Sequence, residues 1–248
     1  MNKHNLEIIE TTVLRGRVKL LQPKVGFHAS IDAVFLAAAV SVKDRLKVLD
    51  IGCGVGTVGL CIASRNKTIS LTGIDIQSDL IDIAHQNAVL NSVADQCRFF
   101  HGDIQKEKTI ENNHFHTVVM NPPYLESGAH LSSPEKIKAT SHSGVPLEHW
   151  VKYAHSKLKQ GGTLTLIHRA DRMDDVIHHL IKKRWFGSLV VYPLHPHEGE
   201  DAKRIIIRAR KERYAPLVLK AGIVIHKDDG QYTAAAQKVL SEGGVIDW

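Results

Sequence analysis

The 248-residue sequence has few cysteines and no long apolar run, and both absences exclude whole classes of protein. Cys53, Cys61 and Cys97 have no spacing typical of a disulfide framework. Such a chain suits a reducing compartment, so we expect a cytoplasmic protein. The longest apolar stretch, residues 34–42, is shorter than the ~18 residues of a membrane span and is internal, unlike a signal peptide. No membrane association is expected.

A metal site is not expected either, although the chain has 16 histidines. The pair His178-His179 and the run His195-Pro196-His197 look like ligand pairs. No Cys or carboxylate stands beside them at a recognised zinc spacing, however. We therefore interpret them as ordinary surface or loop histidines.

Positive charge is concentrated in one part of the chain. Residues 1–133 carry 13 basic and 13 acidic side chains, whereas residues 134–220 carry 17 basic against 9 acidic, a net of +8. Such an excess is typical of a surface that contacts a phosphate backbone, so we expect RNA as a partner. The alternative is a solubilising surface that binds nothing, with Lys182, Lys183 and Arg184 merely ending a helix.

The order of predicted elements indicates one α/β domain, as the length allows. Residues 1–45 are predicted to form a small N-terminal extension of a hairpin and a helix, and residues 46–248 the main domain. The expected strands of the main domain are 46–50, 69–74, 97–100, 115–120, 162–167, 188–192 and 205–210. The expected helices are 31–40, 58–63, 78–90, 147–158 and 171–185. Residues 125–145 lack periodicity and are predicted to form a functional loop.

Asn121-Pro122-Pro123-Tyr124 directly follows the predicted strand 115–120. It should therefore lie past the carboxyl end of a strand, where open α/β sheets bind ligands. Two prolines fix two φ angles and remove two N–H donors, so the carbonyls there have no local donor. Beside them stand an amide oxygen and an aromatic ring. This set suits holding the –NH2 of a flat amine while its nitrogen attacks an electrophile, and these four are the candidate catalytic residues.

A glycine-rich turn follows the first strand of the main domain. After Asp50 the chain has Gly52, Gly54 and Gly56, and glycines let the backbone approach a ligand closely. A dinucleotide site would have G-x-G-x-x-G, with a glycine where this chain has Thr57. The observed G-x-G-x-G spacing favours a ligand without a pyrophosphate and argues against NAD.

Two further acidic residues follow the next two predicted strands. Asp75 stands at the tip of strand 69–74, where a carboxylate can accept both hydroxyls of a ribose. Asp103 follows strand 97–100 and can accept the amino group of an adenine. The glycine turn, the two acids and N-P-P-Y, taken in this order, predict S-adenosylmethionine as the cofactor.

With these motifs the sequence resembles the class I, Rossmann-like S-adenosylmethionine-dependent methyltransferases that methylate amino groups. It is most similar to bacterial tRNA adenine-N6 methyltransferases that modify the anticodon-loop adenosine of a valine tRNA. The finer similarity lies in residues 26–33, 203–207 and 223–233.

The resemblance implies a seven-stranded mixed sheet with helices on both faces, whose last two strands are antiparallel at one edge. It also places His28 and Asp32 near the methionine end of the cofactor, although Asp32, like Ser30, could instead cap a helix. The cofactor-binding residues expected from motifs and resemblance together are His28, Asp32, Asp50, Gly52, Gly54, Gly56, Asp75, Ile76, Asp103, Ile104 and Asn121.

The predicted activity is methyl transfer from S-adenosylmethionine to an exocyclic amine, with adenine N6 in tRNA favoured. The basic segment and the N-terminal Arg15, Arg17 and Lys19 support RNA. Cytosine N4, guanine N2 in rRNA and a protein glutamine amide remain alternatives, as does an RNA-binding protein without turnover. We expect a monomer or a homodimer.

Overall fold

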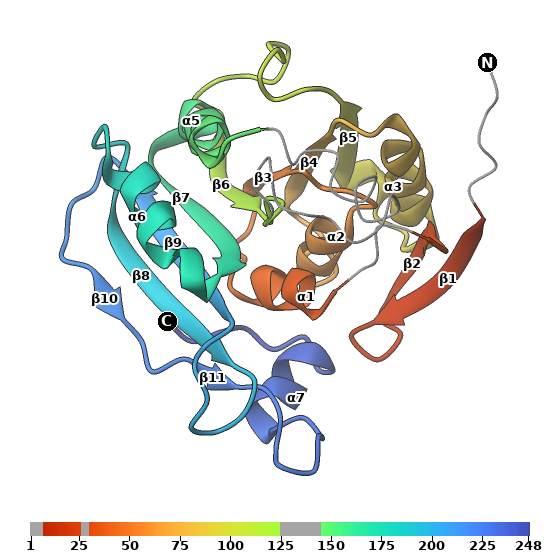
Figure 1. Ribbon diagram of the computed structural model, residues 1–248. Coiled ribbons are helices and arrows are strands. Elements are labelled where there is room, and N and C mark those ends of the chain that lie inside the picture. The colour runs from red at the N-terminus through yellow and green to blue at the C-terminus, as the bar shows by residue number, and fades with distance from the viewer. Residues whose placement is uncertain (1–6, 26–29, 125–144) are drawn as a thin grey trace.

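The structure is a computed structural model that describes residues 7–25, 30–124 and 145–248. It has a nine-stranded mixed sheet preceded by a two-stranded hairpin (Figure 1). The hairpin consists of β1 (Ile8–Val13) and β2 (Val18–Pro23). The sheet consists of β3 (Lys47–Ile51), β4 (Ser70–Asp75), β5 (Cys97–His101), β6 (Phe115–Met120), β7 (Leu158–Arg169), β8 (Phe186–His195), β9 (Arg204–Lys211), β10 (Val218–Leu219) and β11 (Ile223–Val224). The helices are α1 (Ile31–Ala38), α2 (Thr57–Ala63), α3 (Ser78–Leu90), α5 (Leu147–Lys157), α6 (Met173–Ile181) and α7 (Ala234–Leu240), with 3-10 turns at Ala94–Gln96 and Ala170–Arg172.

The strand order brings two distant segments together in the middle of the sheet. The longer strands run in the order β8-β9-β7-β6-β3-β4-β5, and among them β9 alone runs antiparallel to its neighbours. From β3 the chain moves outward through β4 to β5, then crosses back to β6 on the other side of β3. Ile51 of β3 pairs with Met120 of β6. The segments that follow these two residues therefore start side by side, at the point where a doubly wound sheet binds ligands.

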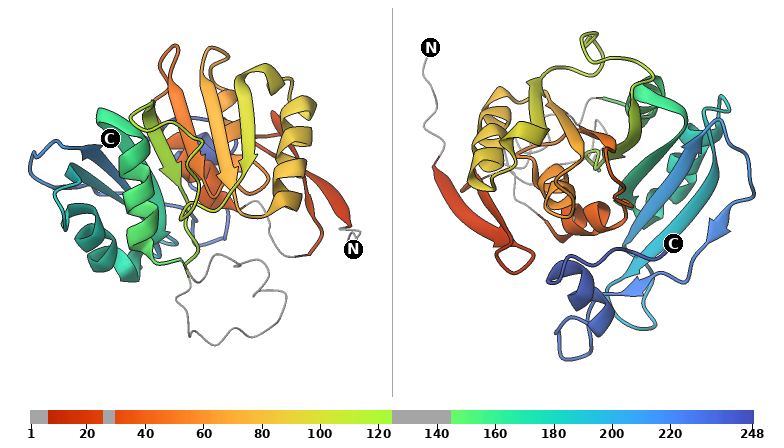
Figure 2. Two further views of the ribbon diagram at one scale, coloured as in Figure 1. Left: turned by 90° about the horizontal axis from the view of Figure 1, so that it is seen from above. Right: turned by 180° about the vertical axis from the view of Figure 1, so that it is seen from behind.

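Helices cover both faces because the central strands bury side chains on both sides. Val118 and Met120 of β6 belong to the apolar cluster that includes α5 and α6. Val119, which points the other way, belongs to the cluster that includes α1, α2, α3 and α7. Figure 2 shows these two helical layers with the sheet between them. No helix in the described parts of the chain is long and apolar enough to cross a membrane.

The N-terminal hairpin is attached to α3 through two asparagines one helical turn apart. Asn87 accepts a hydrogen bond from the Leu21 amide at 2.6 Å and donates to its carbonyl at 2.9 Å. Asn91 makes the same pair of bonds with Lys19, at 2.9 and 2.7 Å. Each side-chain amide thus makes with β2 the two hydrogen bonds that a residue of a neighbouring strand would make. The proposed boundary at residue 45 stays a prediction. Helix α1, which precedes this boundary, shares its buried cluster with α2 and the sheet.

The expected α/β class is confirmed, and each of the seven predicted strands of the main domain is present. The sheet nevertheless has nine strands, because β10 and β11 pair with β8 over two residues each. Two residues cannot display an alternating pattern, so the sequence does not signal such strands. Helix α7 was also not predicted, and α6 ends at Ile181 rather than at residue 185.

Gly52 allows α5 to pack closely against the sheet. Its φ is +70°, and an added Cβ atom would lie 2.8 Å from a ring carbon of Trp150. Trp150 is on α5 and only 2% exposed, so the indole has little room to move away. Any side chain at position 52 would therefore meet both backbone strain and a steric clash.

We expect Gly52→Ala to lower the free energy of unfolding by about 1–2 kcal/mol from the positive φ alone. Overpacking against Trp150 should add roughly 1–3 kcal/mol. Gly199→Ala is the matched control, since Gly199 has φ +77° but no atom within 4 Å of its added Cβ. Urea unfolding measures both variants, and equal losses would show that the Trp150 contact imposes no constraint.

Candidate active site

The glycine turn after β3 is held against the tip of β4. Gly52, Gly54 and Gly56 have φ angles of +70°, +54° and +88°, as the glycine interpretation of the sequence requires. The amides of Gly52 and Cys53 both donate to the Ile74 carbonyl, at 2.8 and 3.0 Å. The turn is therefore a rigid backbone surface at the carboxyl edge of the sheet.

Asp75 anchors this turn from the end of β4. One carboxylate oxygen accepts a hydrogen bond from the Gly54 amide at 2.9 Å, and the other accepts one from the Gln77 amide at 2.9 Å. Each oxygen of a carboxylate has a further lone pair, so the group can also accept ribose hydroxyls. The ribose contact stays a prediction. The backbone bonds also mean that Asp75→Ala would loosen the turn, so Asp75→Asn tests this contact more selectively.

Asp50 faces the start of α2 and is almost completely buried. Its carboxylate accepts a hydrogen bond from the Gly59 amide at 3.2 Å. Burial raises the pKa of Asp50 to about 7, and the negative charge of Asp75 adds to this, whereas the Gly59 bond lowers it. In the structure Asp50 thus joins the strand to the helix that follows the turn, and its role toward a cofactor stays a prediction.

Asp103 lies beyond the end of β5, at the same edge of the sheet. Asp75 pairs with His101, so Asp103 comes two residues after that pair. Its carboxylate accepts a hydrogen bond from the Gln105 amide at 2.9 Å and lies 3.8 Å from the Lys106 ammonium. The carbonyl of Ile76 is 3.0 Å from the His101 imidazole, and Ile104 packs on the α5 side. The structure thus brings these residues to one edge, and their adenine contacts stay predictions.

This edge suits S-adenosylmethionine by its chemistry. Carboxylates accept hydrogen bonds from hydroxyl and amino groups and attract a sulfonium cation, but they repel a pyrophosphate. Asp50 lies near the carboxyl end of β3, Asp75 ends β4 and Asp103 follows β5, and these three strands are adjacent and parallel. Within the described residues, no group of three His, Cys, Asp or Glu side chains is placed to hold a metal ion.

The N-P-P-Y segment continues from β6 into a hydrogen-bonded cluster with α1 and β9. The Tyr124 hydroxyl lies 2.8 Å from the Asn121 amide oxygen and 2.9 Å from an oxygen of Asp32. Arg204 donates from Nε to the same Asp32 oxygen at 2.9 Å. We call Asp32, Asn121, Tyr124 and Arg204 the Tyr124 cluster. Three segments that are far apart in the sequence thus meet at the end of β6.

The cluster shows whether the Asp32 side chain caps helix α1. Its carboxylate contacts Tyr124 and Arg204, and no side chain forms a capping hydrogen bond at the start of α1. Asp32 is therefore not a helix cap, and its contact with the cofactor stays a prediction. His28 and most of the predicted loop 125–145 lie outside the described residues.

The ring of Tyr124 is already in contact on more than one side. The Arg204 guanidinium lies 4.8 Å from the ring centroid, and the His168 ring makes an edge contact at 5.2 Å. The predicted stacking of a base on Tyr124 would therefore use the face that Arg204 leaves open, or would displace Arg204. Burial, together with the Asp32 charge, raises the pKa of Tyr124, so the phenol keeps its proton.

Arg204 and His168 were not predicted as site residues. Burial lowers the pKa of His168 to about 4, so the ring is neutral at physiological pH. A signal for Arg204 does exist: it begins the run Arg204, Ile206, Arg208, Arg210 on one face of β9, where an interior strand would have apolar residues. His168 stands next to the last residue of β7, after Leu166 and Ile167, and carries no comparable pattern.

Comparison with known proteins identifies the family. Residues 27–184 match the family described as the methyltransferase small domain. The chain belongs to this family. The relatives of this methyltransferase include one from Vibrio campbellii, 26% identical over 208 residues, which cover 83% of this chain and 84% of the relative. Another, from Porphyromonas gingivalis, is 32% identical over 162 residues, 64% of this chain and 63% of the relative. Both carry the name tRNA1(Val) (adenine(37)-N6)-methyltransferase.

A solved structure supports the same conclusion for the fold. The crystal structure of a predicted O-methyltransferase from Agrobacterium tumefaciens superposes with a TM-score of 0.73 and 24% identity, over 87% of this chain and 98% of that one. At this identity the likeness shows the fold alone, and it confirms the Rossmann-like methyltransferase fold. By its family the protein is an S-adenosylmethionine-dependent methyltransferase, and S-adenosylmethionine is its methyl donor.

We expect the Asp32–Arg204 pair to stabilise the fold measurably. The two side chains are only 14% and 33% exposed, so the coupling energy in a double-mutant cycle of Asp32→Asn and Arg204→Gln should reach about 1 kcal/mol. The pair of Lys24 and Glu7, 54% and 69% exposed, is the control and should give about 0–0.5 kcal/mol. Urea unfolding measures both cycles, and similar couplings would mean that Arg204 does not hold the cluster.

Asp50 should make stability depend on pH in a defined direction. Its pKa is raised from 3.8 to about 7, so between these values the folded protein holds a proton that the unfolded chain releases. Stability from this group is therefore lost as the pH rises through that window. Asp50→Asn removes the effect, so the variant should gain stability relative to wild type between pH 4 and 8, on the order of a few kcal/mol. Asp82→Asn, on the exposed side of α3, controls for the loss of one carboxylate, and parallel pH profiles for Asp50→Asn and wild type would contradict the expectation.

Proposed function

We propose that this methyltransferase transfers the methyl group to N6 of an adenine in tRNA. The observation that carries the proposal is the position of Asn121-Pro122-Pro123-Tyr124 at the end of β6, directly beside the glycine turn at the end of β3. An amine held by N-P-P-Y would thereby lie next to a cofactor held by the turn. The names of the relatives, tRNA adenine-N6 methyltransferases, support the choice of amine and of RNA.

Asn121 and Pro122 would make an aromatic amine a better nucleophile. The lone pair of such an amine is delocalised into the ring, which makes the nitrogen a weak nucleophile. Hydrogen bonds from its two N–H groups to the Asn121 oxygen and the Pro122 carbonyl would draw it toward sp³ geometry and direct the lone pair. In the described residues, no backbone amide donates to the Pro122 carbonyl. When bound, S-adenosylmethionine supplies an electrophilic methyl group.

The Tyr124 cluster would set the orientation of Asn121. The Tyr124 phenol has one proton, and the Asp32 carboxylate is a stronger acceptor for it than the Asn121 amide oxygen. The Asn121 oxygen can therefore accept from a substrate amine without losing an essential partner. No residue needs to act as a strong base, because positioning alone supplies large rate gains, with effective molarities of ~10⁵ M or more.

The test is to identify the methylated product. The protein is incubated with labelled S-adenosylmethionine and, separately, with total tRNA, total rRNA, DNA and a release factor, and the products are digested and separated. We expect label in N6-methyladenosine from tRNA. Label in N2-methylguanosine, in N4-methylcytidine or in a protein glutamine would replace adenine N6 by that acceptor.

Asn121→Ala provides the control for mechanism in the same assay. Removing one orienting hydrogen-bond partner should lower kcat by ~10²-fold or more, while the calorimetric affinity for S-adenosylmethionine changes little. Asn66→Ala, whose amide contacts Asp44 at an exposed site, should keep full activity. A wild-type rate in Asn121→Ala would remove N-P-P-Y from the mechanism.

A further inference from the structure

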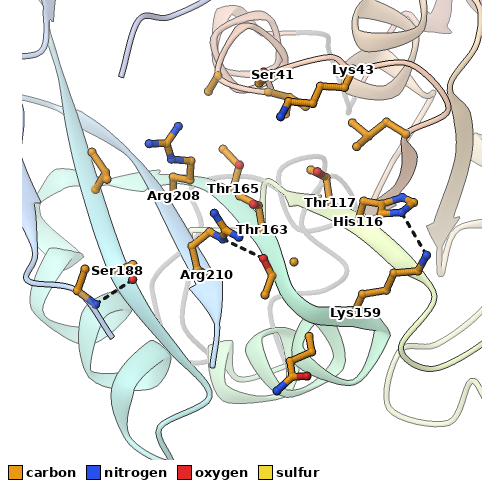
Figure 3. Close-up of a pocket in the computed structure, with 18 of the residues that line it drawn as sticks. Ser41, Lys43, His116, Thr117, Lys159, Thr163, Thr165, Ser188, Arg208 and Arg210 are labelled. Carbon is orange, nitrogen blue, oxygen red and sulfur yellow. Dashed lines mark hydrogen bonds between the residues drawn. The ribbon is translucent and has the colours of Figure 1, made fainter. Parts of the chain in front are cut away.

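Figure 3 shows a basic groove. It is lined by residues at the starts of β3, β6 and β7, so it lies at the opposite end of these strands from the N-P-P-Y segment. Its volume is about 650 Å³, and it is lined by the segment after α1, the starts of β6 and β7, and the end of β9. We call it the β7–β9 groove. Nothing in the proposed catalytic role uses it.

The groove presents hydrogen-bond donors and no acid. Its cations are Lys43, Lys159, Arg208 and Arg210, and no Asp or Glu lines it. Thr163 and Thr165 of β7 also line the groove and carry hydroxyl groups, and they pair across the sheet with Arg210 and Arg208. Among the described residues, none of the four cations forms an ion pair with a carboxylate. Such a lining fits phosphate groups, which accept several hydrogen bonds at once.

The two arginines are held in place. The Arg208 guanidinium lies 4.4 Å from the ring centroid of Trp248, whose indole N–H donates to the Ala39 carbonyl at 2.9 Å. Arg210 donates from Nε to the Gly161 carbonyl at 2.9 Å, which leaves the rest of its guanidinium for the groove. Figure 3 shows both side chains directed into the same space. Little side-chain entropy would therefore be lost when they bind an anion.

The structure brings like charges together here without compensation. Burial and the neighbouring Arg210 charge lower the pKa of the Arg208 guanidinium, which means that the folded state disfavours this charge. At His116, two hydrogen-bond donors face each other. Its Nδ1 accepts from the Lys47 amide at 3.0 Å, so Nε2 carries the proton and faces the Lys159 ammonium at 3.1 Å. An anion that lay beside both donors and accepted a hydrogen bond from each would resolve the conflict.

We propose that the β7–β9 groove binds the sugar–phosphate backbone of the RNA substrate, away from the nucleotide that is methylated. The inference rests on the proposed function. Among the described residues no Phe, Tyr or Trp lines the groove, so its cations and hydroxyl groups would contact phosphates rather than stack on several bases.

Strand β9 argues for a polymer rather than a small anion. It carries Arg204 in the Tyr124 cluster at one end and Arg210 in the groove near the other. Six residues of a strand span about 20 Å at roughly 3.4 Å each, which a mononucleotide does not bridge. The basic run Lys182-Lys183-Arg184, by contrast, is partly neutralised. Glu148 lies 3.4 and 3.7 Å from the two lysines, and Arg184 lies 4.6 Å from the centroid of the Tyr214 ring.

The test compares salt dependence in the full-length protein. Each phosphate contact contributes about threefold to the loss of affinity between 50 and 200 mM salt, so two lost contacts should shrink that loss by about tenfold. We expect this for Arg208→Gln/Arg210→Gln in tRNA binding, with a raised KM for tRNA, nearly unchanged kcat at saturation and unchanged affinity for S-adenosylmethionine. Lys43→Gln/Lys159→Gln tests the same groove through two lysines, in case the arginine variant folds poorly.

Lys67→Gln/Arg98→Gln removes two exposed positive charges outside the groove, Arg98 being on edge strand β5, and should leave the salt slope unchanged. The inference is overturned if the groove variants bind tRNA with the wild-type slope, or if the slope changes in Lys182→Gln/Lys183→Gln instead. It is also overturned if the groove variants lose only the binding of inorganic pyrophosphate, which would show a small-anion site. If the wild-type protein methylates no RNA at all, the proposed function fails first, and a pyrophosphate titration still reports on the groove.

Discussion

The parallel pairing of β3 with β6 is the constraint on which the proposed chemistry depends. Because Ile51 pairs with Met120, the glycine turn and N-P-P-Y leave the sheet at the same level and from adjacent strands. A shift of one residue in this register would turn Val118, Val119 and Met120 to the opposite faces and would break both apolar clusters. Burial of the strand therefore sets the distance between the predicted methyl donor and acceptor sites.

Several polar side chains hold the glycine turn and N-P-P-Y in place through hydrogen bonds to other elements. Asn87 bonds to Leu21 of the hairpin and also donates to the Val55 carbonyl in the glycine turn at 3.0 Å. Asp75 holds the same turn from β4. On the other side, Arg204 and Asp32 join β9 and α1 to Tyr124. Loss of any of these side chains would leave buried or partly buried partners unsatisfied, which costs more than an average hydrogen bond contributes.

The two ends of the sheet have opposite electrostatic character. The carboxyl edge has the carboxylates of Asp75 and Asp103, which suit a cationic cofactor rich in hydroxyl and amino groups. The amino edge has Lys43, Lys159, Arg208 and Arg210, which suit phosphates. A polyanion that bound only at the carboxyl edge would meet these carboxylates. A second contact at the amino edge would let the protein attract RNA with cations that lie away from the sulfonium.

The sequence by itself determined the α/β class, the seven long strands and the motifs that follow β3, β4, β5 and β6, because apolar periodicity and glycine spacing are local properties. Composition also showed that the excess of positive charge lies after residue 133. Only the tertiary structure decided that Asp32 contacts Tyr124 and Arg204 instead of capping a helix, since those residues are 92 and 172 positions away. It likewise decided which basic residues have a carboxylate partner within the described parts of the chain. The pairing of Lys182 with Glu148 and the gathering of Arg208, Arg210 and Lys159 depend on how separate strands and helices pack. Such long-range contacts carry no periodic signal, and packing alone brings them together.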